Sequence, residues 1–159
     1  MLKKLLASAA ITAALVAAPA MAQDQDPFSG FYVGGEVGYE NGNAGFDQVI
    51  YGGFAGYNFK LDGNFFVGVE GEFTGTSSSL IDYSYGGTGS LGYVVRDDLA
   101  VFARAGYRQF ALPNISDGGD YTLGLGMQFA LTENISVRPI IETTAFDLLT
   151  LRGGIAWSF

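Results

Sequence analysis

Every second residue from Leu149 to the C-terminal Phe159 is apolar or glycine, and the positions between them include Thr150, Arg152 and Ser158. Successive side chains of a β-strand point to opposite faces, so this segment would have one apolar face and one polar face. A sheet made of such strands must cover its apolar faces, either with a protein core or with lipid. The alternation constrains the fold more strongly than any other feature, because it recurs along most of the chain.

The alternation predicts eight strands, each with an apolar set of residues and a second set that carries glycines and polar side chains. In the second strand both sets are apolar, and we assign Tyr51, Ala55, Tyr57 and Phe59 to its outward face. No charged residue falls in an outward set. Because an arginine or lysine facing lipid at mid-bilayer costs about 2–4 kcal/mol, this distribution favours lipid outside the strands. The predicted strands are 31–39, 49–59, 65–73, 83–95, 99–108, 121–129, 135–142 and 149–159.

The connections between these segments alternate in length. Short polar connections lie at 60–64, 96–98 and 132–134, and longer ones lie near 40–48, 74–82 and 109–120. Barrels of bacterial outer membranes have short periplasmic turns and longer extracellular loops. We therefore predict an all-β fold, an eight-stranded antiparallel up-and-down transmembrane β-barrel with both chain ends in the periplasm. The acidic residues assigned to its outer loops are Glu40, Asp47, Asp82, Asp117, Asp120 and Asp147.

The N-terminus has the features of a secretory signal peptide. A basic start at Lys3 and Lys4 precedes an apolar, alanine-rich run, which ends at a small-x-small cleavage site closed by Ala22. The apolar run is shorter than the roughly 20 residues that a membrane-spanning helix needs. We expect residues 1–22 to be removed and residues 23–159 to form the barrel domain.

The composition excludes several classes of function. The chain has no histidine and no cysteine, which excludes histidine-based triads, histidine-ligated metal sites and disulfides. Of the 8 basic residues, Lys3 and Lys4 leave with the signal peptide, so 16 acidic residues face 6 basic ones and nucleic acid is not an expected partner. Glu70 and Glu72 could suggest glycoside hydrolysis, but they share one strand face with no substrate-sized opening expected beside them. We expect no enzymatic activity, no cofactor and no metal site.

The inward sets contain as many arginines as glutamates. The interior of an eight-stranded barrel is just wide enough for side chains to fill it, so we expect a plug of ion pairs, a neutral lumen and inward glycines that make room for arginine stems. Since the last strand of such a barrel lies between the seventh and the first, Arg152 should contact Glu142 or Glu36. The predicted lumen network is Glu36, Glu70, Glu72, Glu142, Arg104, Arg108, Arg138 and Arg152.

Aromatic residues gather near the predicted strand ends, as expected for two belts at the depth of the lipid headgroups. The end with the short connections has Tyr57, Phe59, Phe65, Tyr93, Phe129, Trp157 and Phe159, and the other end has Tyr39, Phe73, Tyr83, Tyr107 and Tyr121.

Several short motifs carry a resemblance to a known family. They are Tyr32-Val33-Gly34-Gly35, Gly52-Gly53-Phe54-Ala55-Gly56-Tyr57, Val69-Glu70-Gly71-Glu72, Arg104-Ala105-Gly106-Tyr107 and Gly153-Gly154-Ile155-Ala156-Trp157-Ser158-Phe159. With the signal peptide, they resemble the small outer-membrane β-barrel proteins of Gram-negative bacteria. These are the porin-family and opacity-type surface proteins, similar in fold to the transmembrane domain of outer-membrane protein A. The resemblance covers essentially the whole mature chain.

The resemblance implies contact with outer-membrane lipid and lipopolysaccharide. It also implies that Trp157 and Phe159 form a signal for the barrel-assembly machinery. The chain departs from the family pattern at Pro139, which lies inside a strand, and no segment after Phe159 could be a peptidoglycan-binding domain. Because proline cannot donate a ladder hydrogen bond, we expect a bulge or a local irregularity at Pro139.

These features predict a structural or surface-interaction protein of the bacterial outer membrane, with an unknown loop ligand. One alternative is a narrow small-solute channel gated by the inward charges, which bilayer conductance would distinguish. Another is a soluble periplasmic ligand-binding barrel, which would be extracted without detergent. That alternative leaves the aromatic belts in water and does not explain the terminal Phe159.

Overall fold

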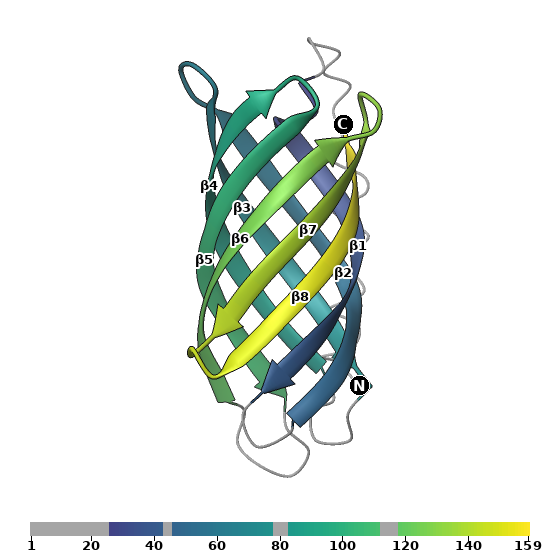
Figure 1. Cartoon of the computed structure of the whole chain (residues 1–159), viewed down its shortest axis with the longest axis vertical. Coiled ribbons are helices and arrows are strands. Elements are labelled where there is room, and N and C mark those ends of the chain that lie inside the picture. Colours follow the sequence, from purple (N-terminus) through teal and green to yellow (C-terminus); the bar gives the residue numbers. More distant parts are fainter. Residues whose placement is uncertain (1–25, 43–45, 78–82, 112–117) are drawn as a thin grey trace, which may run out of the picture.

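Eight strands close into one barrel in the computed structural model of the chain, which describes residues 26–42, 46–77, 83–111 and 118–159 (Figure 1). Each strand is antiparallel to both of its neighbours, and the last pairs back with the first. The predicted eight-stranded up-and-down barrel is therefore confirmed. The predicted signal peptide, Asp82 and Asp117 lie outside the described residues. The strands are β1 (Gly30–Gly42), β2 (Phe46–Lys60), β3 (Phe65–Thr76), β4 (Tyr83–Arg96), β5 (Leu99–Ala111), β6 (Gly118–Ala130), β7 (Ile135–Thr144) and β8 (Leu148–Ser158).

The two ends of the barrel differ. The turn end, uppermost in Figure 1, carries the turns after β2, β4 and β6 together with the C-terminus, and the opposite end is the loop end. The predicted strands agree with the observed ones within one residue at the turn end, but at the loop end the observed strands run up to three residues further. The ladder continues there through polar residues, for example where Asn41 pairs with Asp47. Glu40, Asp47 and Asp120 therefore belong to strands, and their assignment to loops was wrong.

The two faces of the sheet differ as the alternation predicts. The side chains of β8 alternate between buried and exposed along nearly its whole length. In β2, whose facing was ambiguous, Tyr51, Tyr57 and Phe59 are exposed, Ala55 is half-buried, and Phe54 is buried inside the barrel. Between the predicted strand ends, the outward face is thus apolar or glycine in every strand, whereas the inward face holds the buried charged residues; the exposed acid Asp47 lies beyond that region, at the loop end of β2. No helix in the described part of the chain is long and apolar enough to cross a membrane.

Aromatic rings from neighbouring strands contact each other at both ends of the barrel. At the turn end the ring centroids of Phe65 and Tyr93 are 4.9 Å apart, and at the loop end those of Phe73 and Tyr83 are 5.4 Å apart. All four rings are exposed on the outer surface. Aromatic side chains in these positions are typical of the two interfaces of a membrane.

Pro139 interrupts the ladder on one side only. It lies opposite Gly153 in an unbroken β7–β8 register. On its other side, the pairing of β7 with β6 stops at Ile140 and resumes at Val137 without a shift of register. The missing N–H of proline accounts for the gap. The predicted irregularity is therefore an interruption of the ladder, and the bulge that we considered does not occur.

The turn between β4 and β5 holds an exposed ion pair. Arg96 Nε lies 2.5 Å from Asp98 Oδ1, and both side chains are more than half exposed. The hydrogen bond from Arg96 holds the pKa of the Asp98 carboxyl below its usual value. Exposed ion pairs of this kind add little stability. Because its side chain is exposed to water, Arg96 is the reference with which the buried arginines described below are compared.

Candidate functional site in the barrel lumen

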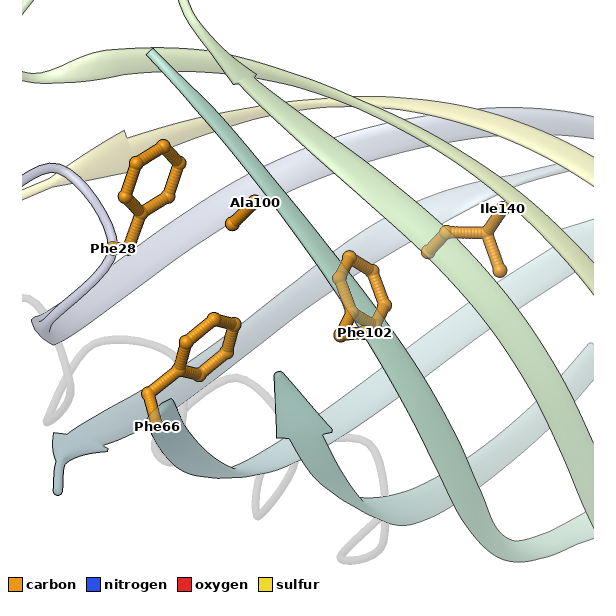
Figure 2. Packing of buried hydrophobic residues seen from close by; sticks show 5 residues of the cluster. All are labelled: Phe28, Phe66, Ala100, Phe102 and Ile140. Carbon is orange, nitrogen blue, oxygen red and sulfur yellow. The ribbon is translucent and has the colours of Figure 1, made fainter. Parts of the chain in front are cut away.

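The lumen is layered along the barrel axis. The turn-end cluster is apolar and consists of Phe28, Phe66, Ala100, Phe102 and Ile140 (Figure 2). A second apolar cluster follows, with Tyr32, Phe54 and Ala156. The ionic cluster occupies the middle of the barrel and comprises Glu36, Glu40, Glu70, Glu72, Glu142, Arg104, Arg108, Arg138 and Arg152, none of them more than 8% exposed. The hydroxyl layer lies toward the loop end. It consists of the hydroxyl side chains of Thr74, Ser84, Thr122, Thr144 and Thr150, together with the amide of Gln48.

Arg152 of β8 contacts three carboxylates from three other strands. Its Nη1 lies 2.9 Å from Glu36 Oε1 and 3.0 Å from Glu72 Oε2. Its Nη2 lies 2.6 Å from Glu142 Oε1. The structure therefore brings Arg152 to both of the glutamates that strand order predicted, and also to Glu72 of β3.

Arg104 and Arg108, both on β5, converge on two of the same carboxylates. Arg104 Nη2 lies 2.8 Å from Glu72 Oε2, and its Nε lies 3.3 Å from Glu142 Oε2. Arg108 Nε lies 3.3 Å from Glu72 Oε1, and its Nη2 donates a hydrogen bond to Glu142 Oε1. With Arg152, each of these two glutamates is bound by three arginines. Strands on opposite sides of the barrel are thereby joined through its centre.

Arg138 joins the ionic cluster to the aromatic residues nearer the turn end. Its Nη1 lies 2.7 Å from Glu70 Oε2, the same oxygen that accepts a hydrogen bond of 2.8 Å from the Tyr32 hydroxyl. The guanidinium carbon lies 4.6 Å from the ring centroid of Phe54 and 5.5 Å from that of Phe102. Arginine over an aromatic face gains cation–π energy, which helps to offset its burial.

Glu40 changes the charge balance of the lumen. Its side chain is 2% exposed, its Oε1 lies 2.7 Å from Arg108 Nη1, and its Oε2 accepts a hydrogen bond of 2.6 Å from Gln48. The described lumen therefore holds five glutamates against four arginines, one acid more than the predicted network of four and four. Glu40 has the parity of Glu36, so it points inward as soon as β1 continues beyond Tyr39.

The inward glycines make room for aromatic rings more than for arginines. A Cβ atom on Gly34 would overlap the ring of Phe54, and one on Gly126 would overlap the ring of Phe102. The expected arginine stem is the neighbour at Gly124, where a Cβ would lie 3.2 Å from Arg104 Cγ. The role that we predicted for these glycines is therefore only partly correct, because Gly34, Gly92 and Gly126 face aromatic rings, whereas Gly38 and Gly124 face arginine stems.

The arrangement can neutralise charge but leaves little freedom for acid–base chemistry. Glu70 and Glu72 are each bound by arginines and their side chains are at most 5% exposed. Removing two charges from water is compensated only when the geometry is good and further hydrogen bonds are made, which a shared network supplies. The cluster is thus held together by shared ion pairs, although Nε of Arg104, Arg138 and Arg152 and Oε2 of Glu142 have no hydrogen-bond partner among the described residues.

Trp157 and Phe159 lie on the outer surface at the turn end, and each is 49% exposed. The backbone N–H of Phe159 donates a hydrogen bond of 3.0 Å to the carbonyl oxygen of Phe31, and the two rings have centroids 5.8 Å apart. The last residue of the chain therefore pairs with β1 at the seam where the barrel closes.

Five of the described lumen residues lie outside the predicted strands: Gln48, Thr74 and Thr144 just beyond strand ends, and Glu40 and Phe28. Glu40 follows the last apolar residue of its segment and so resembled the start of a loop. Phe28 precedes the first alternating segment and stands alone between Pro27 and Ser29. Phe28 is the single aromatic residue in the otherwise polar segment between the predicted cleavage site and the first strand, and this could have indicated that it is buried.

Comparison with known proteins gives consistent results. Residues 10–153 match a family described as outer membrane protein beta-barrel domain. The chain is 31% identical over 129 residues to a 22 kDa outer membrane protein of Rhizobium leguminosarum bv. viciae, covering 70% of this chain and 61% of that protein. The match thus spans about three fifths of the length of this relative.

Three similar solved structures are bacterial outer-membrane or surface barrels. Neisserial surface protein A gives a TM-score of 0.59 at 16% identity and covers 82% of this chain and 98% of that one. The N-terminal β-barrel domain of OprF from Pseudomonas aeruginosa gives 0.56 at 17% identity, covering 82% and 99%. The attachment invasion locus protein Ail of Yersinia pestis gives 0.55 at 16% identity, covering 80% and 94%. At these identities the similarity shows the fold alone.

Proposed function

Because the chain belongs to the family of outer membrane protein beta-barrel domains, we propose that it has a structural and surface-interaction role in the cell envelope and that ion pairs fill its lumen. The protein is located in the bacterial outer membrane. In this role the barrel strengthens the bilayer and exposes its loop end, and it does not carry solutes across.

The observation that carries this proposal is the continuity of the ionic cluster across the barrel. Arg108 on β5 contacts Glu40 on β1 and Glu72 on β3, and Arg152 on β8 also contacts Glu72. In a conduit, charged side chains would be solvated by the water that passes them. Here the ion-paired side chains of the cluster are at most 6% exposed, which supports a filled interior.

The outer surface supports three proposed partners. Its apolar face suits the acyl chains of outer-membrane lipid, and the aromatic belt at the loop end suits the headgroup region of lipopolysaccharide. Trp157 and Phe159 are exposed at the turn end, where the barrel-assembly machinery could bind them. The loop end carries the acidic Asp47 and Asp147 and would present a negative surface to an external ligand, whose identity is unknown.

The second candidate is a narrow small-solute channel. It is favoured by the hydroxyl layer, where Thr74, Thr122 and Thr144 have buried hydroxyl oxygens without a protein hydrogen-bond partner in the described part of the chain. Polar groups of this kind suit a hydrated vestibule. The ionic cluster, which lies between the hydroxyl layer and the turn end, argues against a continuous path for solutes.

Planar-bilayer conductance and liposome swelling test the proposal. We expect refolded wild-type barrel to give a silent bilayer and no swelling with small sugars. Ion-selective openings in the wild type that disappear in Arg152→Ala or Glu142→Ala would instead support transport. Glu133→Ala is the matched control, because Glu133 is an exposed acid in the turn after β6. Heat-dependent migration on gels would verify that every variant is folded.

A further inference from the structure

The residues just before β1 turn back into the mouth of the barrel. Phe28 is 2% exposed, and its ring lies within the turn-end cluster (Figure 2). A residue from outside the strand ladder thus completes an interior layer to which three strands contribute. The members of the cluster from these strands are Phe66 of β3, Ala100 and Phe102 of β5 and Ile140 of β7, with Val94 and Ala130 packed against them.

Polar contacts fix the same segment to the rim. The carbonyl oxygen of Pro27 accepts a hydrogen bond of 3.2 Å from Gln128 Nε2 of β6. Asp26 Oδ2 lies 2.6 Å from Lys60 Nζ at the end of β2, and Asp26 Oδ1 accepts a hydrogen bond of 3.0 Å from the backbone N–H of Phe28. The segment is therefore held in its own tight turn and anchored on two sides of the mouth.

The geometry separates this segment from the ladder. Gly30, the first residue of β1, has a φ of 90°, in a region that favours glycine, so the chain changes direction sharply between Phe28 and the strand. A hollow of about 480 Å³ borders the segment, between residues 26–28 and the turns after β2 and β4. The segment thus faces open space on one side, and no ladder hydrogen bond of β1 depends on it.

We propose that residues 26–29 form a stopper that seals the turn end of the lumen, with the ring of Phe28 as its plug. Behind the stopper, the other residues of the turn-end cluster and the second apolar cluster fill the lumen as far as the ionic cluster, so they still cover Ala156 when the ring of Phe28 is removed. The stopper keeps periplasmic water and small solutes from the turn-end cluster. This holds whether the barrel is a structural protein or a channel, so the inference does not depend on the proposed function.

Cysteine accessibility tests the stopper directly, because the native chain has no cysteine. Ala100 is 0% exposed, belongs to the same turn-end cluster as Phe28 and lies near the start of β5 at the turn end, so Ala100→Cys reports on the mouth. The barrel would be refolded into phospholipid nanodiscs, which leave both ends open to a water-soluble maleimide. We expect Phe28→Ala to raise the labelling rate of Ala100→Cys by about tenfold or more, since the buried apolar ring no longer holds the mouth shut. If Ala100→Cys does not fold, Val94→Cys at the edge of the same cluster replaces it.

Two further cysteines show where the opening occurs. Asp97→Cys, in the exposed turn after β4, should react rapidly and equally with and without Phe28. Ala156→Cys, 1% exposed in the second apolar cluster, should stay protected in both backgrounds. Equal labelling of Ala100→Cys in both backgrounds would overturn the proposal. So would faster labelling that also reaches Ala156→Cys, because Phe28→Ala would then have loosened the whole barrel instead of opening its mouth.

Discussion

Arg108 of β5 reaches across the lumen to Glu40 of β1, and its Nη1 lies 2.7 Å from Glu40 Oε1. These two strands lie on opposite sides of an eight-stranded barrel. The contact closes the ionic cluster on its loop-end side, where Glu40 also accepts hydrogen bonds from Gln48 and Thr150. A residue with the sequence context of a loop is thus part of the interior.

The first prediction concerns Glu40 itself. Glu40→Gln removes a buried charge that accepts a hydrogen bond from a guanidinium, so it should lower the free energy of unfolding by about 1.5–3 kcal/mol. Asp47→Asn is the matched control, because Asp47 is an exposed acid on the neighbouring strand. Its effect should stay within about 0.5 kcal/mol. Urea unfolding in micelles, followed by the fluorescence of the single tryptophan, measures both; equal effects would mean that Glu40 is solvated.

Glu142 is one of the two carboxylates on which Arg104, Arg108 and Arg152 converge, the other being Glu72. Glu142→Gln leaves Arg104, Arg108 and Arg152 with one negative charge fewer among them, and losing one member of a buried ionic network costs about 3–5 kcal/mol. We expect a larger loss of stability than at Glu36, which is within ion-pair distance of Arg152. Glu133→Gln, in the exposed turn, should be near neutral in the same urea titration. A loss at Glu142 no larger than that at Glu133 would contradict the buried network.

Two glycines of β4 make a matched pair for packing. A Cβ on Gly92 would overlap the ring of Phe66, whereas one on Gly89 would meet nothing closer than the Gly68 carbonyl oxygen at 3.9 Å. Gly92→Ala should therefore destabilise the barrel by about 1–3 kcal/mol through overpacking. Gly89→Ala should be neutral or stabilising by up to about 1 kcal/mol, because alanine loses less backbone entropy in a strand. Urea unfolding measures both variants. If the unfolding midpoint of Gly89→Ala were lower than that of Gly92→Ala, the Phe66 ring would not lie against Gly92 as the structure has it.

Substitution of the terminal Phe159 can distinguish a role in assembly in the cell from a role in the stability of the folded barrel. If Phe159 is a signal for the barrel-assembly machinery, Phe159→Ala should lower the amount of folded barrel in outer-membrane fractions several-fold while refolding in detergent remains efficient. The hydrogen bond from the backbone N–H of Phe159 to the carbonyl oxygen of Phe31 does not need the Phe159 ring, so β8 should still pair with β1 in the variant. Comparable loss in cells and in detergent would assign Phe159 a purely structural role. Phe146→Ala, an exposed aromatic at the loop end, is the control.

The alternation of side chains was sufficient to predict the fold and the direction in which the charged residues face. Parity assigns each residue of a strand to one of two faces, and the alternation of short and longer connections indicated an up-and-down barrel. It predicted the neighbours of Arg152 in β1 and β7, because adjacent strands fix them. It could not predict contacts across the lumen, such as that of Arg108 with Glu40, because these depend on the tilt of the strands and the reach of the side chains.

The errors at the strand ends have a common physical cause. The apolar pattern ends where the bilayer ends, but backbone pairing continues for up to three residues beyond it, so the apolar pattern gives strands that are too short at the loop end. Phe28 was missed for a different reason, since a non-strand segment has no periodicity to indicate its facing. Its position depends on the pocket formed by Phe66, Phe102 and Ile140, which exists only once the barrel has closed.

Hydrogen exchange of the arginine side chains tests the filled lumen most directly. The chain has five arginines: Arg104, Arg108, Arg138 and Arg152 lie in the ionic cluster, whereas the side chain of Arg96 is 67% exposed. NMR of the refolded barrel with ¹⁵N-labelled arginine should show four Nε–H signals that exchange slowly with water and one, from Arg96, that exchanges fast. Five signals with similar fast exchange would mean that water fills the lumen and that the ionic cluster does not exist as a closed network.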